Sequence, residues 1–203
     1  MKASKETLLW MYEKMQEIRH YEETMAQVYL EGKLPPNIQK GLAFDIGSGP
    51  VPGEMHLAAG QEPVAVGVCA HLTDHDTVVG THRPHHFAIA KGVPLDAMTA
   101  EMFGKVTGLG KGKGGHMHLF DPQRNFSCSG IIGASLPPAC GAGLAAKKLG
   151  KDWVAVAFCH RPAHWSQLVI GTMEPRRDRH IEATPGSAHR SQRRIGIMEP
   201  VLF

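Results

Sequence analysis

The sequence predicts an α/β protein with an open, mostly parallel sheet and flanking helices. Two short runs have the composition of strands: DTVVGT at residues 76–81, and WVAVAF at residues 153–158, which is uninterrupted and apolar like strands buried on both faces. Helical segments lie around them, and strands that alternate with helices indicate a parallel sheet. The chain has 203 residues and 42% apolar content, enough for a core without disulfides or metals.

The first element is a helix from Ser4 to about Leu30. Apolar residues recur there at three- and four-residue steps, and Ser4 and Gly32 are a suitable cap and stop. The remaining elements follow in order: a long loop rich in proline and glycine at 34–60, a buried helix within 61–72, the strand at 76–81, a helix at 94–105, a glycine-dense loop at 107–120, a small-residue helix within 131–150, and the strand at 153–158.

The net charge of +3 is confined to the last part of the chain. Residues 160–203 hold seven arginines, no lysine and four acids, whereas residues 1–159 are neutral. We therefore expect an incomplete domain at 1–158 and an Arg-rich tail at 159–203, disordered apart from a turn of helix. Because its first residues are charged throughout, we expect no signal peptide, and no apolar run is long enough for a membrane. The four cysteines are far apart, which favours buried free thiols and a cytoplasmic location.

The segment THRPHHFAIAKG at residues 81–92 is the first candidate for chemistry. It follows the carboxyl end of a predicted strand, where open α/β sheets bind ligands. Arg83 and the histidines would suit a phosphate or carboxylate, and a polar surface turn is the plain alternative. A metal site is a further interpretation, held by one of two groups: His82, His85 and His86, or His71 and His75.

The glycine-dense loop at residues 110–118 is the second candidate. It fits G-x-G-x-x-G through Gly110, Gly112 and Gly115, but that motif requires a strand before it and a helix after it, which the sequence does not predict here. The loop can guard an anionic substrate with its lysines, or it can simply be solvated and flexible.

Five segments, taken in order, resemble the alpha subunit of thiamine-diphosphate-dependent 2-oxo acid dehydrogenases, a family that includes the pyruvate, acetoin and branched-chain enzymes. They are GEMHLAAGQEPVAVGV, DTVVGTHRPHH, GKGKGGHMHLF, SGIIGASLPPACGAGLAAK and DWVAVAF. The resemblance implies a thiamine-diphosphate-binding fold, an alpha2beta2 assembly with a beta subunit, and docking to a lipoyl acyltransferase core. In such enzymes the cofactor decarboxylates a 2-oxo acid and the acyl unit passes to lipoamide, while the protein orients the cofactor.

Matching this chain to the family motifs implies six site residues. His56 and His118 stand at active-site histidines, His82 and Arg83 at the cofactor diphosphate, and Gly130 and Ile132 at its aminopyrimidine ring.

The chain departs from the family after Phe158. The family has a Gly-Asp/Glu-Gly segment here and a later Asn, which complete a magnesium site; this chain has Cys159, His160, Arg161 and Pro162, and no Asn after Asn125. Because Mg²⁺ needs oxygen ligands, we expect no metal site and an inactive chain.

The change at Phe158 has two interpretations, a truncated or frameshifted reading and a true variant. The nucleotide sequence across codons 158–165 distinguishes them. Two other functions stay open: a non-catalytic module whose basic tail binds nucleic acid or an acidic partner, and a His-rich metalloprotein. The acids and prolines among the tail arginines make nucleic-acid binding the weaker expectation.

Overall fold

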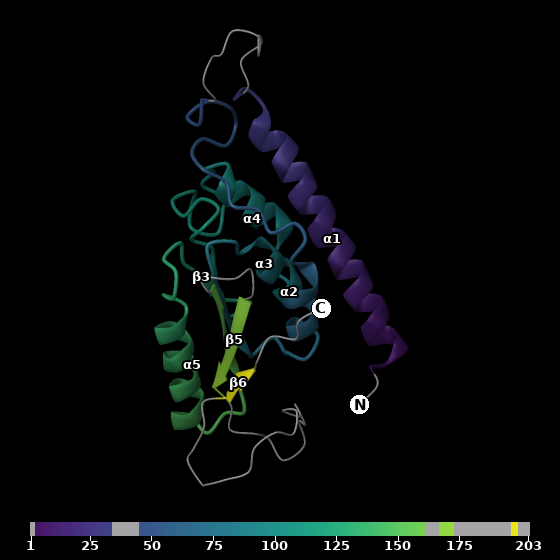
Figure 1. Cartoon of the computed structure of the whole chain (residues 1–203). Coiled ribbons are helices and arrows are strands. Elements are labelled where there is room, and N and C mark those ends of the chain that lie inside the picture. The colour runs from purple at the N-terminus through teal and green to yellow at the C-terminus, as the bar shows by residue number, and fades with distance from the viewer. Residues whose placement is uncertain (1–2, 34–44, 161–166, 173–195, 199–203) are drawn as a thin grey trace.

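A computed structural model of the chain describes residues 3–33, 45–160, 167–172 and 196–198 (Figure 1). The described elements are α1 (Lys5–Leu30), α2 (Glu62–Cys69), β1 (Thr77–Gly80), α3 (His85–Lys91), α4 (Leu95–Met102), β2 (Phe120–Asp121), β3 (Phe126–Cys128), α5 (Leu136–Lys148), β4 (Ala155–His160), β5 (Gln167–Thr172) and β6 (Gly196–Met198). None of the helices in these ranges is both long and apolar enough to cross a membrane.

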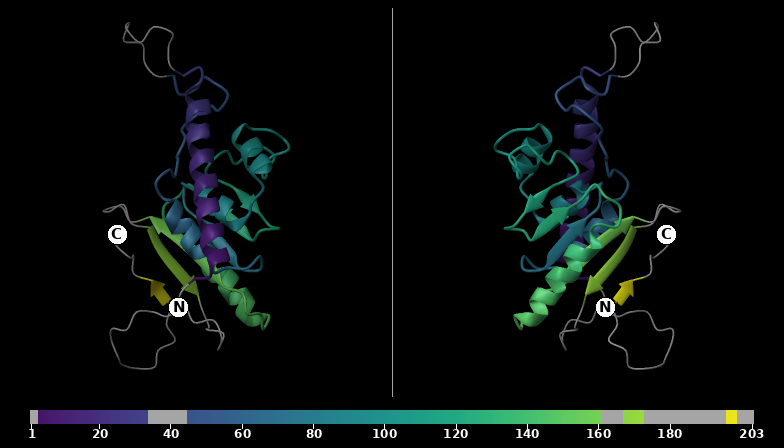
Figure 2. Two further views of the ribbon diagram at one scale, coloured as in Figure 1. Left: turned by 90° about the vertical axis from the view of Figure 1, so that its right-hand side faces the viewer. Right: turned by 90° about the vertical axis from the view of Figure 1, so that its left-hand side faces the viewer.

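The strands form one sheet in the order β2-β3-β1-β4-β5-β6. Its centre is parallel, since β1 pairs in parallel with both β3 and β4, while the outer pairs are antiparallel. Helix α5 covers one face of the sheet, and α1, α2, α3 and α4 lie on the other side (Figures 1 and 2). The predicted α/β class is confirmed, with a mixed sheet that is parallel at its centre.

Alternate side chains of the central strands face the two helical layers. Val156 and Phe158 of β4 pack in the large core with the N-terminal helices, whereas Ala155, Ala157 and Cys159 pack against α5. This two-residue alternation is the geometry of a strand, and here both faces are covered. The expected buried strand is confirmed for residues 155–158, but β4 begins two residues later than the apolar run at 153–158 and continues to His160.

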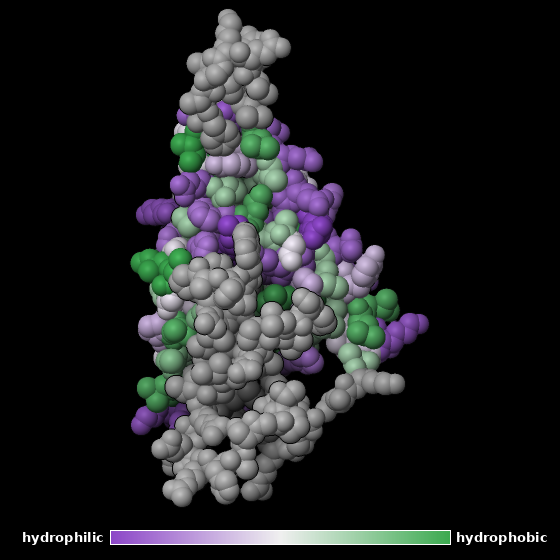
Figure 3. Space-filling view, viewed as in Figure 1, coloured by the Kyte–Doolittle hydropathy of each residue, from purple (hydrophilic) through white to green (hydrophobic). Residues whose placement is uncertain are grey.

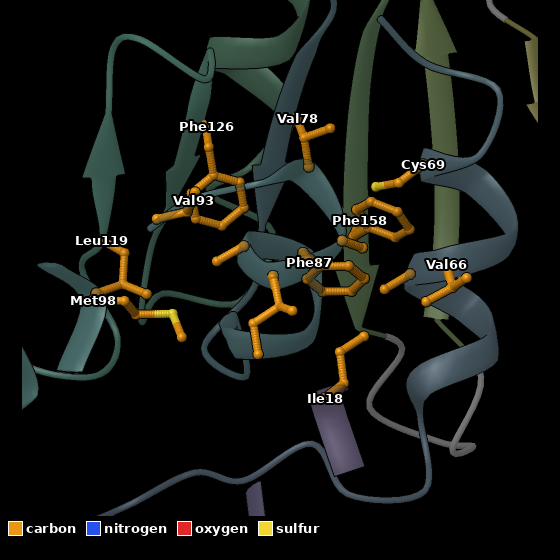
Figure 4. Close-up of a cluster of buried hydrophobic side chains, with 14 of the residues drawn as sticks. Ile18, Val66, Cys69, Val78, Phe87, Val93, Met98, Leu119, Phe126 and Phe158 are labelled. Carbon is orange, nitrogen blue, oxygen red and sulfur yellow. The ribbon is translucent and has the colours of Figure 1, made fainter. Parts of the chain in front are cut away.

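The large core is centred on two stacked rings (Figure 4). Phe87 of α3 and Phe158 of β4 are both fully buried, with ring centroids 3.8 Å apart. Gly80 allows this packing at the end of β1, because an added Cβ would lie 3.3 Å from the Phe87 ring. The sheet thus holds α3 close to the carboxyl end of β1.

Helix α1 confirms the long N-terminal helix. Ser4 caps it by accepting a hydrogen bond of 3.1 Å from the Thr7 N–H, and Gly32 follows its end with a φ of +73°. Ile18, Glu22 and Met25 are the buried residues of this helix. The N-terminal turns carry exposed apolar side chains, and green residues gather over them in Figure 3.

Two predictions differ from the structure in this part of the chain. Residues 85–91 form helix α3, which the sequence presented as a loop or polar surface turn; Phe87 and its neighbours are buried, so packing rather than polarity decides their conformation. Of the four free cysteines, Cys140 is exposed and Cys128 only half-buried, whereas all were expected inside. The small-residue helix α5 turns Cys140 outward.

The Arg-rich segment enters the sheet at two places. The backbone of β5 pairs with β4 over six residues, from Ala155 opposite Thr172 to His160 opposite Gln167, and β6 pairs with β5. The sequence predicted a disordered tail over 159–203, but its described residues 159–160, 167–172 and 196–198 are strand, because their backbones pair in the sheet. The tail arginines proposed for a binding module lie outside the described ranges. The loop expected at 34–60 is described from residue 45, where it has no helix or strand.

Candidate active site

A cluster of four histidines lies at the carboxyl end of β1, where α3 begins. We call His56, His82, His85 and His116 the histidine cluster. His56 Nδ1 and His116 Nε2 are 2.9 Å apart and hydrogen-bonded, and their rings stack with centroids 5.2 Å apart. The His82 ring meets the His56 ring edge-on at 5.3 Å, and the His85 ring meets His116 at 6.3 Å. Histidines from separate parts of the sequence therefore form one cluster of imidazole rings.

Arg83 lies beside this cluster and is hydrogen-bonded to the backbone of the residue that follows His56. Its guanidinium donates a hydrogen bond to the carbonyl oxygen of Leu57. Its positive charge also acts on His56, whose pKa is lowered first by burial and then by Arg83. The fork of Arg83, together with imidazole N–H groups, is suited to an anion such as a phosphate.

His116 is held neutral at ordinary pH. Burial, and then the positive charges that His85 and His56 can carry, lower the pKa of His116 to about 4. In a hydrogen bond between two neutral imidazoles, one ring nitrogen donates and the other accepts. The His56–His116 pair can therefore hold one proton between Nδ1 and Nε2.

This shift predicts a pH dependence of stability. Between about pH 6.5 and about pH 4 the unfolded chain protonates His116 while the folded chain does not, so the free energy of unfolding falls as the pH drops through this window. We expect a loss of about 3 kcal/mol from this residue, measured by urea denaturation at several pH values.

Two variants separate this effect from general acid sensitivity. His116→Asn should flatten the dependence between pH 6.5 and pH 4, whereas His71→Asn, at an exposed position, should retain it. Equal slopes in wild type and His116→Asn would contradict the assignment.

The glycine loop after α4 is wrapped around a buried carboxylate. Glu101, on the last turn of α4, is fully buried and accepts hydrogen bonds from the N–H groups of Gly110 at 2.7 Å, Gly112 at 2.9 Å and Gly114 at 2.6 Å. Burial raises the pKa of Glu101, but these backbone donors outweigh it and lower the pKa overall.

Glu101 therefore takes the place that a bound anion would take in such a loop. A turn of successive N–H groups is an anion-binding shape, and here the protein fills it with its own side chain. Gly108 is needed for the close fit, since an added Cβ would lie 2.5 Å from the Glu101 backbone nitrogen. The dinucleotide motif through Gly110, Gly112 and Gly115 has neither a strand before it nor a helix after it.

His118 and Gly130 meet at the end of the same loop. A Cβ on Gly130 would lie 3.3 Å from His118 Nε2. His118 and Ile132 are exposed, and the charge of His118 contributes to the lowered pKa of His116. The predicted site residues thus form two groups, one around His56, His82 and Arg83 and one around His118 and Gly130, with His116 between them.

Sequence reasoning missed His116, Glu22, Glu101 and the burial of His85. A signal existed for Glu22: it lies between Ile18 and Met25 at helical spacing, so a carboxylate interrupts an apolar stripe. His116 stands two residues before His118 in the same motif, GGHMHLF. The role of Glu101 depends on contacts with residues nine to thirteen positions later.

A separate hollow of about 210 Å³ lies at the other end of α3, with Lys91 and Arg124 on its walls. Lys91 donates to the Thr73 carbonyl oxygen at 2.6 Å, and Arg124 pairs with Asp74 at 3.5 Å. Burial lowers the pKa of Lys91. The cations of this hollow bind neighbouring groups of the protein and are not part of the histidine cluster.

Comparison with known proteins identifies the class. The family model for the dehydrogenase E1 component matches residues 38–163, and the chain belongs to that family. The resemblance to alpha subunits of 2-oxo acid dehydrogenases is thereby confirmed.

Individual relatives agree with this class. The alpha subunit of acetoin:2,6-dichlorophenolindophenol oxidoreductase from Bacillus subtilis is 44% identical over 159 residues, which cover 78% of this chain and 43% of the relative. The subunit of the same name from Cupriavidus necator is 44% identical over 156 residues, covering 76% and 42%. The chloroplastic pyruvate dehydrogenase E1 component subunit alpha-3 of Arabidopsis thaliana is 38% identical over 162 residues, covering 76% and 34%. The chain spans less than half the length of these relatives.

The family implies thiamine diphosphate, and the residues present fit its anionic end. Arg83 supplies a charged fork, and the half-buried rings of His56 and His82 lie next to it. Within residues 3–33 and 45–160, no three His, Cys, Asp or Glu side chains are grouped to hold a metal ion. The described residues therefore suit the diphosphate end of the cofactor.

Proposed function

We propose that the chain provides the alpha-subunit part of a thiamine-diphosphate-dependent 2-oxo acid dehydrogenase in the cytoplasm. The whole enzyme would decarboxylate a 2-oxo acid and pass the acyl unit to lipoamide, together with a beta subunit and a lipoyl acyltransferase core. The supporting observation is the meeting of Arg83 with His56, His82 and His116 at the carboxyl end of β1. Ligands of α/β sheets bind at this end of the strands.

Within this proposal each residue has a stated task. Arg83 and His82 hold the diphosphate, Gly130 and Ile132 line the aminopyrimidine ring, and His118 stands at the mouth of the site. The bound cofactor would supply the carbon nucleophile and the electron sink for decarboxylation. His56 and His116 can hold or move a proton at the hydrogen bond between Nδ1 and Nε2, since burial lowers the pKa of both imidazoles.

We further propose that this chain alone is inactive, because the magnesium ligands of the family are missing after Phe158. In the parallel register Val79 of β1 lies opposite Ala157, so residues 158–160 extend β4 beside the end of β1. Cys159 is buried there, with its Sγ 3.4 Å from the Ser135 hydroxyl. A strand of this composition has no carboxylate to offer a cation. The family match ends at residue 163. Within this proposal, the boundary between the family-like domain and the Arg-rich tail lies at residue 158.

Release of CO₂ from pyruvate and other 2-oxo acids tests the function. The chain is mixed with thiamine diphosphate, Mg²⁺ and the beta subunit of a relative, and CO₂ is measured. We expect no release above background with this chain, and full release with the relative's own alpha subunit. Turnover by this chain would contradict the inactivity.

Arg83→Ala tests the diphosphate site directly. We expect thiamine diphosphate binding to weaken about tenfold or more, because a charged hydrogen bond to an anion is lost. The measurement is calorimetric titration. Arg124→Ala is the matched control, since Arg124 pairs with Asp74 outside the cluster and should leave the affinity unchanged. Equal weakening in the two variants would contradict a role for Arg83.

A further inference from the structure

Glu22 is a fully buried carboxylate to which the proposed function assigns no task. It lies in α1 and accepts two hydrogen bonds, one from the Ala58 N–H to Oε2 and one from His85 Nδ1 to Oε1, each 3.0 Å long. His85 is itself fully buried, and its ring forms a T-shaped contact with the Tyr21 ring, with centroids 6.2 Å apart. A buried carboxylate is costly unless its oxygens are bonded, and here each oxygen has one donor.

These bonds fix the short segment that carries His56. Ala58 is held by Glu22 from one side, and the carbonyl oxygen of the preceding Leu57 accepts from Arg83 on the other. His56 stands directly before Leu57 and meets His116. Glu22 therefore connects α1, the segment 56–58 and the beginning of α3.

The same carboxylate determines where His85 carries its proton. An ionised carboxylate only accepts, so Nδ1 of His85 must be protonated to make the observed contact. His85 Nε2 is buried and forms no hydrogen bond within the described residues. The contact between Nδ1 and Glu22 is thus what determines which ring nitrogen of His85 carries the proton.

We propose that Glu22 is a positioning residue of the histidine cluster, which fixes the tautomer of His85 and holds His56 against His116. This inference rests on the proposed function only in taking the cluster as the cofactor site. The contacts themselves exist without any cofactor.

The variant Glu22→Gln gives a sharp test because it keeps the shape and removes one acceptor. The introduced amide has one oxygen and one NH₂ group, so it cannot accept from both Ala58 and His85. The N–H of Ala58 cannot change its direction of donation, but His85 can change its tautomer. We expect the amide oxygen to accept from Ala58, while His85 Nδ1 accepts from the amide NH₂ group and the ring carries its proton on Nε2.

The readout is ¹⁵N NMR of histidine-labelled chain at neutral pH, which distinguishes protonated from unprotonated ring nitrogens. We expect Nδ1–H in wild type and in the control Glu23→Gln, and a shift of the proton to Nε2 in Glu22→Gln. Glu23 is the matched control because it is the next residue of α1, is exposed, and pairs with Arg19 at 3.8 Å. The ring signals of His56 and His116 should move in Glu22→Gln and stay in place in Glu23→Gln.

The proposal is overturned if wild-type His85 carries its only proton on Nε2, a result that requires no variant to fold. It is equally overturned if folded Glu22→Gln retains the wild-type tautomer. Because the measurement uses no cofactor, a failure to bind thiamine diphosphate would count against the proposed function and leave this result unaffected.

Discussion

Replacing Glu101 with alanine is expected to lower the free energy of unfolding by about 3–5 kcal/mol. The change removes the acceptor for the N–H groups of Gly110, Gly112 and Gly114 and leaves a space in the middle of the loop. Urea denaturation monitored by circular dichroism measures the loss. Hydrogen exchange at the three glycine amides should rise by orders of magnitude at the same time.

Asp96→Asn is the control for Glu101→Ala. It changes an exposed acid in the first turn of the same helix, and its effect should stay within about 0.5 kcal/mol. The lowered pKa of Glu101 gives a second check with a defined sign. Its contribution is present above the unfolded pKa and is lost as the pH falls through the lower folded value. A wild-type loop that exchanges as fast as the Ala variant would contradict this role.

Phe87→Ala is expected to cost about 3–5 kcal/mol and to disturb the histidine cluster as well. Phe87 is fully buried on α3 and stacks on Phe158 of β4, so its removal leaves a cavity between helix and sheet. His85 and His86 stand immediately before it on the same short helix. The free energy of unfolding and the histidine NMR signals should therefore change together.

Phe120→Ala is the control for Phe87→Ala, because it also replaces a phenyl ring but at an exposed position. Phe120 lies on β2, and 58% of it is exposed, so we expect a loss below about 1 kcal/mol and unchanged signals from His56 and His116. A comparable loss in both variants would show that the Phe87–Phe158 stack does not hold α3 in place.

The sequence predicted the elements whose patterns are strong and local. The helix of α1 has a continuous three- and four-residue periodicity with a serine cap, and the first four residues of β4 belong to the apolar run at 153–158, so both elements were expected, with β4 displaced by two residues. Helix α3 was missed because it is short, begins with histidines and is buried all round, which removes any periodic signal. Tertiary packing alone makes it a helix.

The candidate site was predictable only where a motif carried it. His56, His82 and Arg83 were expected from the resemblance, and the structure brings them together, although their roles stay predictions. The functions of Glu22 and Glu101 depend on donors between nine and sixty-three residues away along the chain. No local sequence pattern predicts these contacts, because the partners become neighbours only when the chain folds.

We propose that this chain retains the diphosphate half of a thiamine diphosphate site and lacks its magnesium half. Calorimetric titration of thiamine diphosphate into the chain, with Mg²⁺ and with a chelator, tests it most directly. We expect weak binding that requires the diphosphate, since thiamine alone should not bind, and that is the same with and without Mg²⁺. Tight binding that depends on Mg²⁺ would contradict the claim.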